Sequence, residues 1–436
     1  MSGVAISKQH SHLIRGIGLV GGAFLALNGM IGAGIFALPA AVAERAGILS
    51  PWLFLGAGLL MITVVLTMAE LASYFRASGG PVLYATEAFG PLTGFSTGWI
   101  YYVSRVAALA ANMHVMAVYL GTIWAWFDSP AGHYTVIVAL CAGLTIVNII
   151  GVKGGIRTLS LFTVLKVVPL VLLVLAGLRS IGPDILFPTS IPTIDDLGGT
   201  TLLLIYALVG FESILIPAGE TAKPRRTIPI ALIQTVIFTA LFYFLIMLVY
   251  IAVLPGDTAA NGTLVDVGRR LAGPIGAIVI TFAAVFSIGG NLSGSVLAVP
   301  RLTLSLSEHG LLPSWFGRIH PKYASPANSI LFYGGLAMIL GLTGSFVFLA
   351  VASSLTRLIT FGVCIAALPV IRKAADAATR EQAFSLWGGN LVPLLALGVC
   401  VWMAAHSTAK SWLYIGALLL FGLLLYMLEK TFLRKT

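Results

Sequence analysis

The chain has 436 residues, of which 58% are hydrophobic and only 9% are charged. Soluble domains carry about 25% charged residues, so the composition indicates an integral membrane protein and excludes an ordinary soluble domain. The formal net charge is +10, but no basic run with interleaved aromatic residues is present, which argues against nucleic acid as a partner. The three cysteines, Cys141, Cys364 and Cys400, lie inside apolar segments, which argues against a disulfide framework.

Apolar stretches recur along the chain, and a helix needs about 20 apolar residues to cross a bilayer. Counting them predicts an all-α integral membrane protein with about 12 transmembrane helices and short connecting loops. The predicted spans begin near Gly16, Pro51, Pro91, Tyr134, Thr158, Gly198, Pro229, Pro274, Asn328, Phe346, Gly388 and Trp412. The first 15 residues are polar and precede a segment too long for a signal-peptide core, so we expect a signal anchor that is retained.

The first predicted span, 16–43, is interrupted at its midpoint. It carries no charge, yet Gly32 and Gly34 stand at its centre, and each costs a helix about 1 kcal/mol relative to alanine. Unwound backbone deep in a bilayer is tolerated only where it lines a cavity or is buried in protein. Free N–H groups at the start of the outer half-helix form a positive dipole end suited to a carboxylate. The alternative is that both glycines only allow close helix packing. The substrate-binding residues predicted here are Ile31, Gly32, Ala33, Gly34 and Ile35.

The sixth span, which begins near Gly198, is interrupted in the same way. A glycine and a carboxylate stand at mid-membrane, and Pro217 and Gly219 follow. Interrupted segments at corresponding positions of two halves indicate the binding site of an inverted-repeat transporter. We therefore predict two repeats of five spans, 16–180 and 198–372, and two further spans over 388–430. Carbonyl groups freed by the second break would receive a substrate ammonium, and the predicted residues are Val209, Gly210, Phe211 and Glu212.

The basic residues predict the orientation in the membrane. With the N-terminus in the cytoplasm, seventeen Lys and Arg residues fall on the inner side and five on the outer side. The remaining three, Arg105, Lys166 and Arg357, lie within spans. This positive-inside bias explains the net charge without a polyanionic partner. It predicts a multi-pass protein of the plasma (inner) membrane with cytoplasmic tails at 1–15 and 431–436.

Four groups of residues, in matching order on a matching number of spans, resemble the amino acid–polyamine–organocation superfamily over nearly the whole chain. They are 31–36; 69–71 with 78–84 and 87–91; 210–213 with 223–229; and Arg301 with 308–313. The resemblance implies a LeuT-like 5+5 inverted repeat that carries amino acids or related amines by alternating access. Lys223 stands where many relatives have Asn, and Pro81 where Ser is common, which leaves the class unchanged. The expected partners are an amino acid or related amine, protons and membrane lipids, with no cofactor and no metal.

Two charged residues resemble residues that relatives use for coupling. Glu212 is similar to the sixth-helix glutamate of arginine and diamine exchangers. A carboxylate in the middle of a membrane is costly, so it is usually paired with another group or has a function. It is a proton carrier, a binder of a cationic substrate, or one half of a permanent ion pair. Lys166 resembles a fifth-helix lysine that stands where sodium-coupled relatives hold a cation, bonding backbone near 29–32 and hydroxyls such as Ser287. Its alternative is a lysine that reaches the inner headgroups.

The remaining candidates lie around the expected site. Tyr101 and Arg105 share one helix face, which the superfamily presents to the substrate. Arg105 approaches Glu212, contacts an anionic substrate group, or is satisfied by carbonyls elsewhere. Pairing with Glu212 would favour neutral or acidic amino acids. Tyr206 matches an aromatic lid of some relatives, or else is ordinary packing. Arg357 also needs a partner, which the sequence does not identify. Asn112 and His114 are interpreted as polar groups whose hydrogen bonds are satisfied between helices.

The predicted function is therefore secondary active transport of amino acids, independent of sodium and coupled either to protons or to exchange. A polyamine or cationic amino acid antiporter is the alternative within the superfamily. A channel would need a continuous polar lining or a ring of charges, whereas the charges here are isolated. An enzyme would need a nucleophile with a base or a metal cluster, and the seven histidines are scattered along the sequence.

Overall fold

The computed structural model describes residues 17–151, 156–187 and 194–433. The predicted tail 1–15, the start of the first span at Gly16 and residues 434–436 of the second tail lie outside these ranges. Within them the chain is built of helices, and its only β-type pairing is an isolated bridge between Ile17 and Thr221. The described residues contain eight helical segments long and apolar enough to cross a membrane and four shorter apolar helices. The predicted all-α membrane architecture is therefore confirmed.

The helices follow the predicted spans. The first is divided into α1 (Leu19–Met30) and α2 (Gly34–Ala46), and the others are α3 (Ser50–Ser73), α5 (Pro91–Gly121), α6 (Pro130–Ile150), α7 (Ile156–Gly177), α9 (Ile194–Leu208), α10 (Pro224–Val253), α12 (Leu264–Ala298), α14 (Ala327–Thr343), α15 (Phe346–Ala374), α17 (Leu391–Ala405) and α18 (Ala409–Leu428). Shorter helices connect them: α4 (Pro81–Phe89), α8 (Pro183–Leu186), α11 (Asp257–Asn261), α13 (Pro300–Glu308) and α16 (Ala377–Gln382). Single turns are η1 (Gly47–Leu49), η2 (Ala125–Asp128), η3 (Leu178–Ser180), η4 (Phe211–Ile214), η5 (Ala218–Glu220), η6 (Ser314–Gly317) and the π-turn η7 (Glu429–Leu433).

Three predicted starting points are shifted by proline. Helices α6 and α10 begin at Pro130 and Pro224, a few residues before the predicted positions. Proline suits the first helical turn because its N–H is not needed there, and the polar residues that follow hide this turn from an apolar count. Pro274 does not begin a helix but follows a kink in α12, where Gly273 has φ +62°. The helix itself begins at a capping box formed by Thr263 and Asp266.

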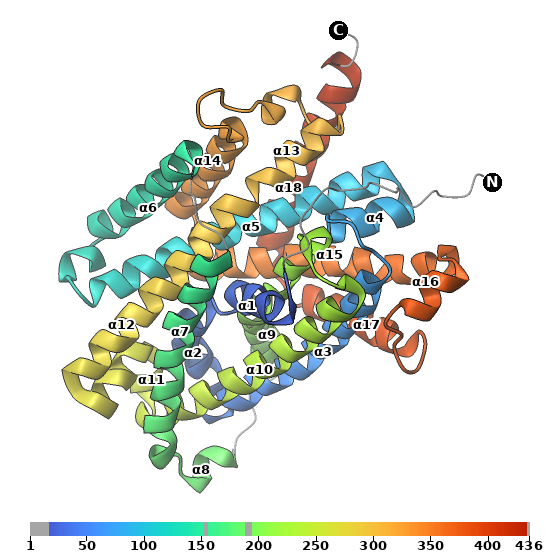
Figure 1. Ribbon diagram of the computed structural model, residues 1–436. Helices are drawn as coiled ribbons and strands as arrows, with labels where there is room; N and C mark the ends of the chain where they lie inside the picture. Colours follow the sequence, from blue (N-terminus) through green and yellow to red (C-terminus); the bar gives the residue numbers. More distant parts are fainter. Residues whose placement is uncertain (1–16, 152–155, 188–193, 434–436) are drawn as a thin grey trace.

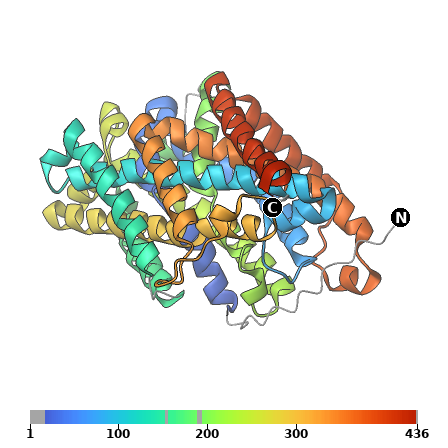
Figure 2. The ribbon, with the colours of Figure 1, turned by 90° about the horizontal axis from the view of Figure 1, so that it is seen from above.

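The two interrupted helices lie at the centre of the bundle. Figure 1 shows α1, α2 and α9 in the middle, with α5, α10, α12 and α15 around them. In an apolar stretch of 18 residues within α5, 89% of the residues are buried inside the protein. The corresponding share is 28% in α6 and 17% in the segment that contains α18. Figure 2, seen from above, places α6 at one edge and α17 with α18 at another. The peripheral helices therefore present apolar side chains outward, as a membrane requires, while α5 lies in the core.

The two breaks touch each other through their backbones. Helix α1 ends at Met30, and Ile31 leaves helical geometry with ψ 82°. Helix α9 ends at Leu208, and Gly210 adopts a left-handed conformation with φ +117°. A Cβ atom on Gly29 would lie 2.3 Å from the carbonyl oxygen of Gly210, and one on Gly210 would lie 2.2 Å from that of Gly29. Both predicted interruptions are confirmed, and glycine is required on each side of their contact.

An ion pair between a buried carboxylate and a partly exposed arginine links three distant segments. Arg372 on α15 donates to both carboxylate oxygens of Glu70 on α3, at 2.6 and 2.7 Å. The backbone N–H of Leu386, in the loop before α17, donates to the same carboxylate at 3.0 Å. Glu70 is 1% exposed, so its charge is fully satisfied inside the protein.

The backbone contact between the breaks predicts that Gly29→Ala destabilises the protein. The added methyl group must push the Gly210 carbonyl or the Ser213 side chain aside, which costs about 1–3 kcal/mol for overpacking. The measurement is the melting temperature of the purified protein in detergent. The matched control is Gly56→Ala in α3, where a Cβ meets nothing within 4 Å and helix propensity improves. Equal melting temperatures for the two variants would contradict a tight contact.

Candidate functional site

The first wall of the site is the start of α2. The N–H groups of Phe36 and Ala37 bond to the Ala33 carbonyl, whereas the first N–H groups of any helix have no acceptor within it. This end of α2 therefore presents free donors and a positive dipole end. Gly34 makes the position possible because it packs against Ala207 of α9, where a Cβ would lie 2.8 Å from the Ala207 Cα.

The second wall is the end of α9. The last carbonyl groups of a helix have no donors within it, and the left-handed turn at Gly210 prevents the helix from continuing to supply them. The N–H group of Gly210 turns instead to the Glu212 carboxylate, at 2.8 Å. The walls thus offer donors at α2 and acceptors near Val209, which is the complement of a zwitterion.

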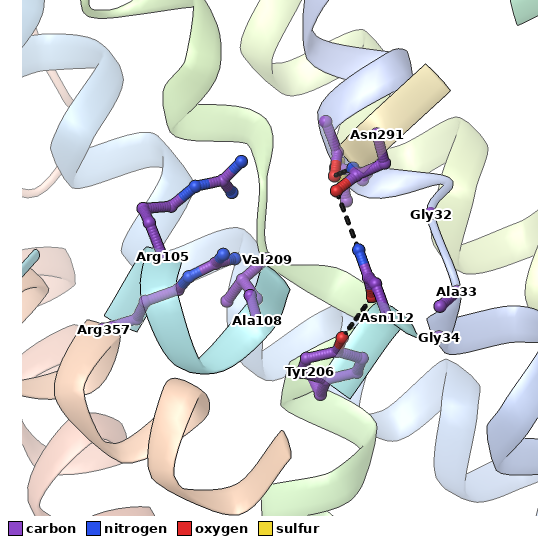
Figure 3. Close-up of a pocket in the computed structure, with 12 residues that line it drawn as sticks. Gly32, Ala33, Gly34, Arg105, Ala108, Asn112, Tyr206, Val209, Asn291 and Arg357 are labelled. Atoms are coloured by element: carbon purple, nitrogen blue, oxygen red, sulfur yellow. Dashed lines mark hydrogen bonds between the residues drawn. The ribbon is translucent and has the colours of Figure 1, made fainter. Parts of the chain in front are cut away.

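A small pocket lies between these walls (Figure 3). Six predicted residues line it: Gly32, Ala33, Gly34, Arg105, Tyr206 and Val209. The other lining residues are Gly29, Met30, Ala108, Asn112, Asn291 and Arg357.

The other predicted substrate residues lie behind the pocket wall. Ile31 and Ile35 are fully buried in the hydrophobic core, and Tyr101 is buried as well. Phe211 stacks on Phe361, with ring centroids 5.2 Å apart. Gly210 and Glu212 are outside the lining because the Glu212 side chain folds back onto the Gly210 N–H.

Tyr206 begins a chain of hydrogen bonds that crosses the pocket (Figure 3). Its hydroxyl donates to Asn112 Oδ1 at 2.5 Å, and Asn112 Nδ2 donates to Asn291 Oδ1 at 3.0 Å. Asn291 Nδ2 in turn reaches the carbonyl oxygens of Asn28 and Gly29, at 3.3 and 3.2 Å. Helices α9, α5 and α12 are therefore linked to the unwound end of α1 by side-chain amides.

Lys166 of α7 lies on the other side of that unwound end. It is fully buried, and its ammonium donates to the Asn28 carbonyl at 3.2 Å, to Asn28 Oδ1 at 2.8 Å and to the Ile31 carbonyl at 2.5 Å. Ser287 of α12 donates to the Ile31 and Gly32 carbonyls, both at 3.0 Å. The expected contact of Lys166 with this backbone is present, and Ser287 shares an acceptor with the lysine. A lysine that reaches the headgroups is excluded by its burial.

Glu212 pairs with Arg357 of α15. An oxygen of its carboxylate lies 3.5 Å from Arg357 Nη1, and Arg357 Nε donates to the Ser104 hydroxyl at 3.0 Å. Arg357 is 3% exposed and Glu212 is fully buried. The described residues therefore provide the partner that the sequence could not name for Arg357. Arg105, which we considered for this pairing, forms no ion pair in the part of the chain described here.

Sequence reasoning missed the two asparagines of the pocket. Asn112 was interpreted as a polar group satisfied between helices, and it is, but it also lines the pocket. It lies seven residues after Arg105, two helical turns along the same face, which is a signal that could have identified it. Asn291 lies four residues after Ser287 and so shares the face of α12 that meets the first break.

A bundle of apolar helices with two broken helices meeting over a polar pocket is the arrangement of a membrane transporter. A sequence model of the amino acid permease family matches residues 17–427. The chain therefore belongs to this family, within the amino acid–polyamine–organocation superfamily. Its relatives and its fold are those of transporters and not of enzymes.

Individual relatives agree on transport and differ in cargo. The chain is 26% identical to the serine/threonine exchanger SteT of Bacillus subtilis over 428 residues, covering 95% of this chain and 96% of the exchanger. It is 32% identical to an uncharacterized transporter of Mycobacterium bovis over 350 residues, covering 76% and 74% of the two chains. It is 25% identical to the methylthioribose transporter of Bacillus subtilis over 429 residues, covering 93% and 91%.

The fold also matches a solved transporter. The structure of MhsT in complex with L-phenylalanine superposes with a TM-score of 0.63, covering 89% of this chain and 98% of MhsT. The sequence identity is 14%, so the likeness concerns the fold alone. The LeuT-like architecture expected from the sequence is confirmed.

The buried Glu212–Arg357 pair predicts a strongly coupled pair of substitutions. Glu212→Gln leaves the Arg357 charge buried without its partner, which costs about 3–5 kcal/mol of stability. Arg357→Gln does the same to Glu212. The variant carrying both changes should melt at a higher temperature than either single variant, because no lone charge remains. Glu44→Gln, at an exposed position, is the control and should leave the melting temperature unchanged. Additive losses in the double variant would contradict a direct pair.

Proposed function

We propose that this protein is a secondary active transporter of amino acids that works by alternating access and does not depend on sodium. The observation that carries the proposal is the pocket between the two broken helices. One of its walls is the start of α2 at Ala33 and Gly34, where the first N–H groups have no acceptor within the helix. The other is the end of α9 near Val209, where the last carbonyl groups have no donor within the helix. The α-carboxylate and α-ammonium of an amino acid complement these two walls. Substrate residues outside the lining, such as Ile31 and Gly210, act by holding the unwound turns in place.

Independence from sodium rests on Lys166. Its ammonium donates to the carbonyls of Asn28 and Ile31, which are the kind of oxygen ligands that a sodium ion would take at the unwound helix. Lys166 and Ser287 thus brace the first break in place of a bound cation. We propose them as coupling residues together with Glu212, whose contact with Gly210 and Arg357 connects the second break to the pocket.

The energy source is either a proton gradient or exchange. The likeness to a serine/threonine exchanger favours exchange, and proton symport is the alternative. A cationic amino acid or polyamine antiporter is less well supported, because Arg105 and Arg357 line the pocket and would repel a second positive charge. Methylthioribose, the cargo named for one relative, belongs in the competition panel.

We further propose that the protein lies in the plasma membrane with both ends in the cytoplasm, contacting lipids through its peripheral helices. The excess of basic residues on one side supports this orientation. The two proposed repeats, 16–180 and 198–372, each begin with one of the broken helices. Their common plan supports the division that the sequence predicts.

The proposal is tested by uptake of radiolabelled amino acids into proteoliposomes, with and without an imposed pH gradient and with and without internal amino acid. Saturable uptake of an amino acid at carrier rates is expected. Uptake that requires internal substrate but does not respond to the pH gradient would indicate exchange. Uptake that is driven by the pH gradient and does not require internal substrate would indicate proton symport. Methylthioribose uptake with no amino acid uptake would overturn the proposal.

Replacing external sodium by choline should leave the uptake rate unchanged, because Lys166 stands where the cation would bind. Lys166→Ala should reduce uptake at least about tenfold, since three oxygen acceptors at the first break lose their common donor. Lys322→Ala, at an exposed position, is the matched control and should transport normally. Sodium-dependent uptake by the unmodified protein would contradict this account of Lys166.

A further inference from the structure

The pocket wall opposite the start of α2 carries two guanidinium groups. Figure 3 shows Arg105 of α5 and Arg357 of α15 side by side, across the pocket from the backbone of Gly32 and Gly34. Arg105 is 7% exposed and Arg357 is 3% exposed, so both charges are held away from bulk water. Buried charges inside a membrane protein require partners or a functional ligand.

Among the residues that the structure describes, only one of these two charges is paired with an opposite charge. Arg357 is paired with Glu212, as described above. Arg105 has no ion pair among the residues that the structure describes, and its Nε atom is buried without a hydrogen-bond partner. Two positively charged guanidinium groups are thus accompanied by one carboxylate, and the positive charge of Arg105 at the pocket is not balanced by a described residue.

The position of the Arg105 guanidinium is fixed by a closed ring of hydrogen bonds. Its Nη2 donates to the Ser295 hydroxyl at 3.3 Å, and Ser295 and Tyr333 share a bond of 2.7 Å. The Tyr333 hydroxyl donates to the backbone carbonyl of Arg105 itself, at 3.0 Å. Since Tyr333 uses its proton there, Ser295 donates to Tyr333 and accepts from the guanidinium. The ring orients the arginine without neutralising it, which is the arrangement of a preformed anion site.

We propose that the substrate carries a second anionic group, besides its α-carboxylate, and that Arg105 binds it. The substrate class is then the acidic amino acids, with the α-carboxylate at the start of α2, the ammonium at the end of α9 and the side-chain carboxylate at Arg105. This inference rests on the proposed function, because it assigns a cargo to the same pocket.

The first experiment uses the unmodified protein in proteoliposomes and compares L-aspartate with L-asparagine, which has the same shape without the charge. The apparent affinity for L-aspartate should be at least about tenfold higher, because a buried charge-assisted bond replaces a neutral one. L-glutamate against L-glutamine provides a second pair. This comparison needs no variant and stays decisive even if substitutions at Arg105 prevent folding.

The second experiment uses Arg105→Gln. The preference for L-aspartate over L-asparagine should disappear, while uptake of L-asparagine is retained or rises. Arg105→Lys keeps the charge but not the planar fork, and should preserve part of the preference. Arg318→Gln, the same change at an exposed arginine, is the matched control and should keep the full preference. Each variant is accepted only if its melting temperature in detergent shows a folded protein.

The outcomes separate the two proposals. Uptake of neutral amino acids with L-aspartate no better than L-asparagine overturns the acidic cargo and leaves amino acid transport standing. Absence of uptake for every amino acid overturns the proposed function itself. An equal loss of L-aspartate and L-asparagine uptake in Arg105→Gln also overturns the inference, because Arg105 would then bind the α-carboxylate common to both.

Discussion

The close contact between the backbones of Gly29 and Gly210 is the constraint on which the rest of the site depends. Each of these glycines occupies the space that a side chain on the other would need. The contact holds two helix ends together in the middle of the bundle, at a depth where water is not available to satisfy free backbone groups. The two helix ends, whose last N–H and C=O groups have no partners within their helices, are consequently brought to one small pocket, and we propose these groups as its binding groups.

Side chains from two other helices stabilise this contact by satisfying the unwound backbone of the first break. Lys166 reaches it from α7, while Ser287 and Asn291 reach it from α12. The chain from Asn291 through Asn112 to Tyr206 then connects the same backbone to the second broken helix. A movement of either break must therefore rearrange amide hydrogen bonds on several helices. In the alternating-access mechanism proposed above, these hydrogen bonds would connect the pocket to Lys166.

Charge is distributed unevenly around this backbone frame. Glu212 and Arg357 neutralise one another beside the second break, and Lys166 is surrounded by carbonyl oxygens. Arg105 is held by hydroxyl groups that fix its position but do not cancel its charge. In a medium of low polarity such an unbalanced charge is costly, and a ligand of opposite charge recovers that cost on binding. On the proposal made above, this unbalanced charge selects the ligand of the pocket electrostatically.

The sequence by itself determined the membrane class, the number and order of the spans, and the two interruptions. Hydropathy and glycine placement are local properties, and their effect on a segment does not depend on which other segments it contacts. The match of the predicted spans to α1–α18 follows from this, and the shifts at Pro130, Pro224 and Pro274 arise where a polar first turn or a kink hides a helix boundary. The sequence also showed that Arg105, Lys166, Glu212 and Arg357 are charges inside spans, because any charge in an apolar run is conspicuous.

Only the tertiary structure decided which of these charges meet. Glu212 is paired with Arg357 and not with Arg105. The rotation of α5 and α15 about their own axes decides which of their side chains face Glu212 in η4. The spacing of residues along a single helix does not determine that rotation. Spacing could place Asn112 and Asn291 on the faces that meet the site, but only their hydrogen bond to one another shows what these amides bind. Local pattern fixed the helices and their breaks; long-range packing fixed the site, because a binding pocket consists of contacts between segments far apart in the chain.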